Sequence, residues 1–160
     1  GALDPAQDDS AKEQQAFNCP KSSYAYRIVK PGERILGVEG GGTKTAWALV
    51  ETVGNATGAE FCILDQGKLP PSNFRLTARE RLRAILGELP KQIDRAGVFL
   101  AGCATEEDRR ALREICLEIW PHAKVVRGSD RASGLAAALD RADGIVVNAG
   151  SGSSVTGRLV

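Results

Sequence analysis

The sequence has no methionine, a single histidine and four cysteines that lie far apart. No two cysteines form a C-x-x-C pair, and one histidine adds little to a metal site, so no zinc or iron–sulfur motif is indicated. Dispersed cysteines are typical of reduced thiols in a cytosolic protein, which is the compartment we expect. Spacing alone leaves a disulfide open.

Long apolar runs and clusters of one charge are also missing. No stretch approaches the ~20 consecutive apolar residues that cross a bilayer, and the N-terminus lacks the basic and apolar regions of a signal peptide. The formal net charge is +1, and no basic run stands out. The sequence therefore predicts neither a nucleic-acid partner nor a membrane partner.

The chain begins with Gly1 and has no methionine, so we expect an excised portion or a matured product of a longer protein. Residues 1–33 are mostly polar, and such a segment buries too little apolar surface to offset its ordering entropy. We expect it to be a linker or tail. Residues 34–142 are predicted to form a first lobe, and residues 143–160 the start of a truncated second lobe.

The most informative stretch is ILGVEGGGTKTAWALV at residues 35–50, where two apolar runs flank three successive glycines. This pattern predicts a strand, a glycine turn and a second strand. Gly40, Gly41 and Gly42 can take positive φ and let a ligand approach the backbone, and successive N–H groups form an anion-binding concavity. A carboxylate at Glu39 would repel a phosphate there unless a divalent cation lay between them. A glycine turn of purely steric origin remains the alternative.

The middle of the chain predicts strands and helices. A third strand is expected at Phe61–Leu64, completing an antiparallel meander. A proline-stiffened loop follows at Gly67–Asn73. Thr77 is expected to cap a first helix with one apolar stripe, and the apolar run Ala96–Ala101 suits a buried parallel strand.

A second helix is expected to open at Thr105 with acidic residues in its first turn, and Cys116 falls on its inner stripe as a core residue. The strand Lys124–Val126 then leads into a third helix that begins at Asp130. The inward side chains of that helix are expected to be Leu135, Ala136 and Leu139.

The final block of the chain repeats the opening pattern about 100 residues later, with a strand, a turn at Gly150–Ser153 and another strand. Two such turns suggest two lobes that offer backbone donors to one anion. Asp130 lies between them at a strand–helix boundary, where ligands of open α/β sheets bind, and is a candidate general base. An ordinary helix N-cap is the alternative for Asp130.

Four segments resemble, in order and spacing, the amino-terminal part of the BadF-type ATPase and N-acetylglucosamine kinase family, within the sugar kinase, Hsp70 and actin superfamily. They are GVEGGGTKT, PPSNF, GSDRASGLAAAL and GIVVNAGSGSS. The resemblance covers about residues 35–160. It implies an α/β fold: a ribonuclease H-like lobe with a mixed five-stranded sheet flanked by helices, followed by the first strands of a second lobe.

The resemblance also implies roles for individual residues. Asp130 falls on the catalytic aspartate of the family, Glu39 on the position that helps to hold Mg²⁺, and Ser72 with Asn73 on the pair that contacts the sugar. The two phosphate motifs for ATP comprise Gly40, Gly41, Gly42, Thr43 and Lys44, and Gly150, Ser151, Gly152 and Ser153. Arg131 departs from the family, whose common pattern around the base is N-D-A.

The activity implied for the intact protein is transfer of the ATP γ-phosphoryl group to a hydroxyl of an amino sugar resembling N-acetylglucosamine. A homodimer is left open, and the resemblance implies an adenosine-binding C-terminal lobe that we expect to be missing from this chain. Two alternatives stand beside the kinase. One is an ATPase that activates a partner such as an acyl-CoA reductase or dehydratase, and the other is a non-catalytic fragment.

Overall fold

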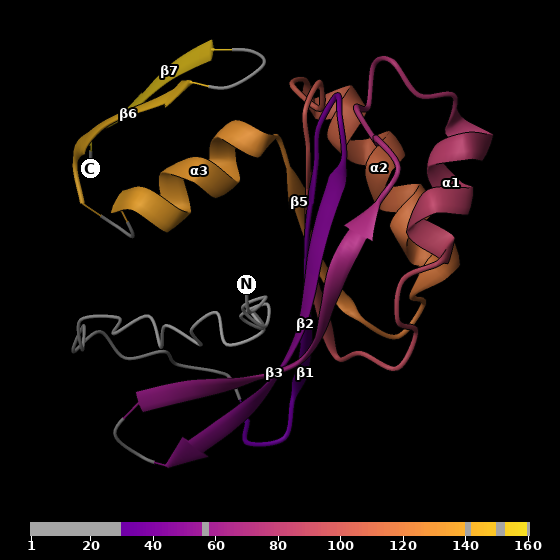
Figure 1. The fold of residues 1–160 in the computed structure, drawn as a ribbon, viewed down its shortest axis with the longest axis vertical. Helices are drawn as coiled ribbons and strands as arrows, with labels where there is room; N and C mark the ends of the chain where they lie inside the picture. Colours follow the sequence, from indigo (N-terminus) through magenta and orange to yellow (C-terminus); the bar gives the residue numbers. More distant parts are fainter. Residues whose placement is uncertain (1–29, 56–57, 140–141, 150–152, 160) are drawn as a thin grey trace, which may run out of the picture.

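A computed structural model describes residues 30–55, 58–139, 142–149 and 153–159. A mixed five-stranded sheet is covered by α1 and α2 on one face and by α3 on the other, and a two-stranded sheet lies beside α3 (Figure 1). The α/β class and the mixed five-stranded sheet that the sequence predicts are therefore confirmed.

The strand order of the large sheet is β3-β2-β1-β4-β5. Its strands are β1 (Arg34–Gly40), β2 (Thr45–Asn55), β3 (Gly58–Leu69), β4 (Arg95–Leu100) and β5 (Lys124–Gly128). The first three form the predicted antiparallel meander, and β4 and β5 run parallel to β1. The other elements are α1 (Arg79–Gly87), α2 (Glu106–Ile119), α3 (Asp130–Leu139), β6 (Gly144–Ala149) and β7 (Ser153–Arg158).

The hydrophobic core lies between the large sheet and the helices α1 and α2. Alternate residues of β1 enter it: Leu36 and Val38 are buried, whereas Glu39 is exposed on the opposite face. Trp120 ends α2 inside the core, and its indole N–H donates to the carbonyl of Pro90 at 2.8 Å. The largest of the other fully buried side chains are Leu82, Ile85, Leu86, Leu89, Leu100, Leu112 and Ile115. Burial of each such side chain favours folding by roughly 1.5–3 kcal/mol.

The start of α2 agrees with the prediction. The hydroxyl of Thr105 accepts the N–H of Asp108 at 3.1 Å, and the Asp108 carboxylate accepts the N–H of Thr105 at 2.9 Å. This reciprocal capping box satisfies N–H groups that have no partner within the helix. Cys116 is buried in the core, as its place on the apolar stripe predicts.

β3 is longer than predicted, because it continues to Leu69 instead of ending at Leu64. It pairs with β2 along its whole length, and a bulge between Leu49 and Val50 takes up the register shift. The predicted loop from Gly67 therefore begins only at Pro70.

The start of α1 also differs from the prediction. The helix begins at Arg79 with Ala78 as its N-cap residue, and no side chain caps it. Thr77 is not the cap because its N–H donates to the carbonyl of Asn73 at 3.0 Å, which makes it part of the preceding turn.

α3 is less deeply embedded than the other helices, since none of its ten residues, all described, is buried. Leu135 and Leu139 are half-buried, and Leu139 packs over Gly144 of β6. The prediction that Ala136 points inward is wrong, because Ala136 is exposed. Within the described residues, no helix has both the length and the apolar character that a bilayer span requires.

Candidate functional site

The candidate site lies where β1 ends and the glycine turn begins. Because β1, β4 and β5 are parallel, their carboxyl ends share one edge of the sheet, and α3 starts there directly after β5. A cavity of about 230 Å³ at this edge is lined by Glu39, Gly40, Gly41, Thr43, Lys44, Ala46 and Asp130. The fold thus brings Asp130 of α3 to the glycine turn, which is distant from it in the sequence.

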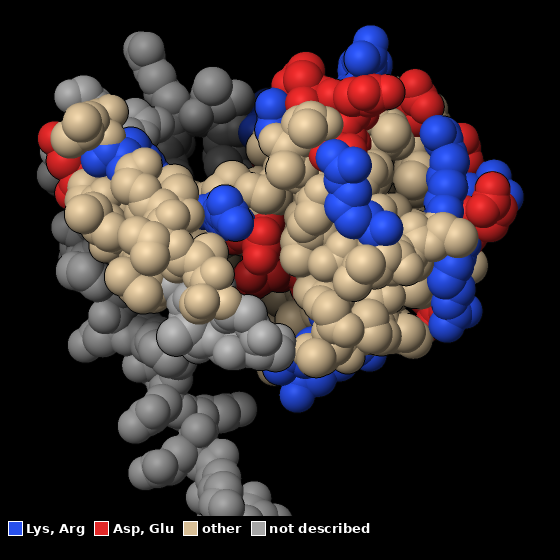
Figure 2. Space-filling view, turned by 90° about the horizontal axis from the view of Figure 1, so that it is seen from above, with Lys and Arg blue, Asp and Glu red and all other residues tan. Residues whose placement is uncertain are grey.

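Charged side chains gather near this edge. Figure 2 shows acidic and basic groups in the hollow between the main sheet with α1 and α2 and the unit formed by α3, β6 and β7. The charged residues that line the cavity are Glu39, Lys44 and Asp130, and none of them makes an ion pair or side-chain hydrogen bond within the described parts of the chain. Both carboxylates and the ammonium group are therefore free to bind a ligand.

The alternative role of Asp130 as a helix cap finds no support. Asp130 is the first residue of α3, and no N–H of the first helical turn donates to its carboxylate. Its backbone carbonyl accepts the hydroxyl of Ser133 at 2.8 Å, a bond that does not involve the carboxylate. Asp130 is half-buried and is one of the residues that line the cavity.

The glycine turn offers backbone donors on the same side. Gly41 donates its N–H to the carbonyl of Lys44 at 2.9 Å, which closes the turn. Among the described residues, the N–H groups of Gly42, Thr43 and Lys44 have no acceptor. Thr43 and Lys44 line the cavity and Gly42 precedes them, and successive free N–H groups in a turn are a donor arrangement that suits an anion.

Gly40, Gly41 and Gly42 can take positive φ, but none of them uses it in the structure. Gly40 is needed for space instead. A Cβ atom at this position would lie 2.0 Å from the hydroxyl oxygen of Ser72. No other residue fits there without displacing Ser72.

Ser72 and Asn73, the predicted sugar-binding pair, do not line the cavity. Ser72 has no exposed surface, and its hydroxyl lies 2.7 Å from the hydroxyl of Thr45. Asn73 is half-buried, and its side-chain oxygen accepts the N–H groups of Arg75 and Leu76 at 3.0 and 3.3 Å. In this structure both side chains order the loop before α1.

The second predicted phosphate motif is not placed by the structure. Gly150, Ser151 and Gly152 lie outside the described residues. Ser153 is the first residue of β7 and pairs with Ala149 of β6, as the predicted strand, turn, strand unit requires. The meeting of the two glycine turns stays a prediction.

Sequence reasoning missed an ion pair that ties the loop before α1 to α2. Arg75 donates to Asp108 at 2.7 Å and to the carbonyl of Gly102 at 3.3 Å. The N–H of Thr105, together with Arg75 and the N–H of Ala104, lowers the pKa of Asp108 to about 2. The only sequence signal was an acidic residue in the first turn of α2, which gives no indication of its partner in the loop.

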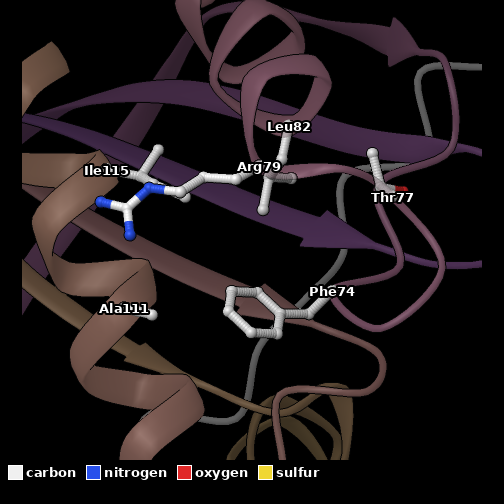
Figure 3. Close-up of a pocket in the computed structure, with 6 residues that line it drawn as sticks. All are labelled: Phe74, Thr77, Arg79, Leu82, Ala111 and Ile115. Atoms are coloured by element: carbon white, nitrogen blue, oxygen red, sulfur yellow. The ribbon is translucent and has the colours of Figure 1, made fainter.

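A second cavity, of about 200 Å³, lies between α1, α2 and the segment that precedes α1 (Figure 3). Its lining residues are Phe74, Thr77, Arg79, Leu82, Ala111 and Ile115. Its walls are mostly apolar, and its one charged group, Arg79, pairs with Glu114 at 3.0 Å. It therefore lacks the unpaired acid and base groups that distinguish the cavity at the glycine turn.

Neither a protein-family model nor a curated protein matches the sequence. Solved structures do match. One, from Porphyromonas gingivalis, is named "putative N-acetylglucosamine kinase"; it is 20% identical, with a TM-score of 0.58, over 77% of this chain and 44% of that protein. Another of that name, from Chromobacterium violaceum, is 20% identical, with a TM-score of 0.54, over 79% of this chain and 46% of that protein. The chain spans less than half the length of either protein and shares their fold over that part.

Proposed function

We propose that the intact protein transfers the γ-phosphoryl group of ATP to a hydroxyl of an amino sugar such as N-acetylglucosamine, and that this chain forms one of its lobes. The observation that carries the proposal is the cavity that joins the glycine turn to the unpaired carboxylate of Asp130. The names of the two structural neighbours support the sugar and the reaction class.

The groups around the cavity fit a phosphate chain with a divalent cation. The free N–H groups of Gly42 and Thr43 and the ammonium group of Lys44 would bind phosphate oxygens. Glu39 beside them would repel phosphate, but carboxylate oxygens are good ligands for Mg²⁺, which binds through one or two carboxylates and several waters. When bound, Mg²⁺ neutralises charge on the phosphates.

Asp130 is the general base in this proposal. Its carboxylate oxygens have no partner in the described residues, so they are free to accept the proton of a sugar hydroxyl. Phosphoryl transfer depends mainly on positioning and charge neutralisation, which the glycine turn and Lys44 would supply. The half-buried Asn73 remains our candidate for a sugar contact, through its amide nitrogen.

The proposal is tested by Asp130→Asn in the full-length protein, with ADP release measured in the presence and absence of N-acetylglucosamine. Loss of a positioned base lowers turnover by ~10²–10⁴-fold, while binding of MgATP is expected to persist. Asp65→Asn, an exposed carboxylate on the edge strand β3, is the matched control and should leave turnover unchanged. Near-normal turnover of Asp130→Asn would remove Asp130 from the mechanism.

A further inference from the structure

We infer that the buried hydroxyl pair of Thr45 and Ser72 positions the glycine turn for phosphate binding, an assignment that rests on the proposed function. Neither side chain lines the cavity, so both act through the turn. They are positioning residues, and this role for Ser72 differs from the direct sugar contact that the sequence predicts.

The residues of the pair are connected to both ends of the turn. Thr45 follows the turn as the first residue of β2, and its hydroxyl lies 2.7 Å from the carbonyl of Pro70 and 2.7 Å from the hydroxyl of Ser72. Ser72 in turn donates its N–H to the carbonyl of Gly41 at 3.2 Å. The segment from Pro70 to Ser72 therefore spans the base of the turn on its buried side.

Hydrogen counting fixes the direction of these bonds. Thr45 has one hydroxyl proton, which it donates to Pro70, because a carbonyl can only accept. The hydroxyl of Ser72 must then donate to Thr45. Both side chains are completely buried, and no buried side-chain polar atom in the described residues lacks a partner. A fully satisfied buried pair favours a single arrangement of the groups bonded to it.

Steric contact adds to the hydrogen bonds. Ser72 fills the space that Gly40 leaves, since a Cβ atom at Gly40 would lie 2.0 Å from the Ser72 hydroxyl oxygen. The carbonyl of Gly40 also accepts the N–H of Ala101 at 2.7 Å. The backbone that enters the turn is therefore held between the Ser72 loop and the end of β4.

The glycine turn can be held in place only through contacts on its buried side. Gly42, Thr43 and Lys44 are all exposed, and adjacent glycines give the backbone wide conformational freedom. Donors bind a charged group best when they are already oriented before the ligand arrives. Orientation of the free N–H groups thus depends on the contacts of Gly40, Gly41 and Thr45 beneath them.

The strand β2 supplies a matched control. Thr52 is a second buried threonine, 3% exposed, and its hydroxyl donates to the carbonyl of Lys30 at 2.5 Å, away from the glycine turn. Thr45→Val and Thr52→Val each remove one buried hydroxyl of the same strand. Thr45→Ser keeps the hydroxyl and is expected to restore normal behaviour.

The experiment compares these variants of the full-length protein by NMR. One readout is hydrogen exchange of the Gly41 amide, and the other is binding of magnesium tripolyphosphate, followed by the amide shifts of the turn. Thr45→Val removes both hydrogen bonds of this hydroxyl, so we expect it to speed Gly41 exchange and to weaken tripolyphosphate binding, each by at least about tenfold. Thr52→Val should leave both within about twofold of wild type.

Equal Gly41 exchange in Thr45→Val and Thr52→Val would overturn the positioning role. If Thr45→Val does not fold, Ser72→Ala replaces it with the same expectation. Failure of the wild-type turn to respond to tripolyphosphate would overturn the proposed function instead, and the Gly41 exchange comparison would still report on the hydroxyl pair. The two failures are therefore distinguishable.

Discussion

Along β1, Leu36 and Val38 point toward α1 and α2 and are at most 3% exposed, whereas Gly37 and Glu39, which alternate with them, are exposed on the face that α3 covers. On the first face, the helices α1 and α2 contribute several fully buried leucine and isoleucine side chains. On the second face, none of the ten residues of α3 is buried, and the cavity with Asp130 lies there.

The first face contributes most of the buried core that stabilises the fold, and the second face holds the candidate site. The α1 and α2 face is closed by apolar packing around the buried core, whereas the α3 face keeps three charged groups, Glu39, Lys44 and Asp130, without an ion pair in the described residues and next to exposed backbone donors. We expect substitutions on the first face to change the free energy of unfolding, and substitutions on the second face to change mainly ligand binding.

The largest effect is expected from truncation of the core. Leu86→Ala in α1 should lower the free energy of unfolding by about 2–5 kcal/mol, because Leu86 is completely buried. The matched change Leu135→Ala in α3, where the side chain is only half-buried, should cost less than about 1.5 kcal/mol. Urea denaturation measures both, and equal losses would show that the α3 face is a core as well.

Substitution of two glycines of β1, one on each face of the sheet, tests the difference between the faces. Gly40→Ala should destabilise the protein by about 1–3 kcal/mol because the new methyl group overlaps the Ser72 hydroxyl and also the Leu100 side chain. Gly37→Ala, on the opposite face, meets only a carbonyl oxygen at 3.9 Å and should change stability by less than about 1 kcal/mol. Adding Ser72→Ala to Gly40→Ala should recover part of the loss, which thermal unfolding of the double variant can show. Strict additivity would mean that the overlap is not the cause.

A smaller effect is expected from acid. The pKa of Asp108 is held at about 2, below its ordinary 3.8, by the N–H of Thr105 and by Arg75. The stabilisation from a lowered pKa is complete above about pH 4 and is lost as the pH falls toward 2. Asp108→Asn should therefore reduce the loss of the free energy of unfolding between about pH 4 and pH 2, which urea unfolding at several pH values measures. An unchanged slope below pH 4 would contradict the assignment.

The smallest effect is expected on the outer surface of α1 and α2. Arg83 pairs with Glu118 at 3.1 Å, but both side chains are about half exposed. Arg83→Ala should change the free energy of unfolding by less than about 1 kcal/mol, and the change should shrink at high salt. A loss comparable to that of Leu86→Ala would show that the helix surface, too, carries stability.

Much of the fold could be predicted from local patterns. The meander, the parallel strand β4, the cap at Thr105 and the core position of Cys116 follow from apolar periodicity and capping chemistry. The end of β3 could not be predicted, because its polar residues near Lys68 are held in the strand by pairing with β2. The exposure of Ala136 could not be predicted either, because it depends on which sheet α3 packs against.

The residues of the candidate site could be predicted from the sequence, but the contacts that hold them in place could not. Glycine-rich and acidic residues indicate the turn and Asp130, which the cavity brings together. Burial of Ser72 under the turn depends on a contact between Gly40 and a loop more than 25 residues later, and no local pattern predicts it. The same is true of the pair formed by Arg75 and Asp108.

The position of β1 at the centre of the sheet also bears on how the chain is made. Its antiparallel neighbour β2 follows at once, but the parallel neighbour β4 follows about 60 residues later. At about 5–20 residues per second of synthesis, one edge of β1 stays open for about 3–12 s after it leaves the ribosome. Of the two helices that cover Leu36 and Val38, α1 is synthesised within that interval but α2 only after β4, so the apolar face of the nascent meander is not fully covered until α2 is made.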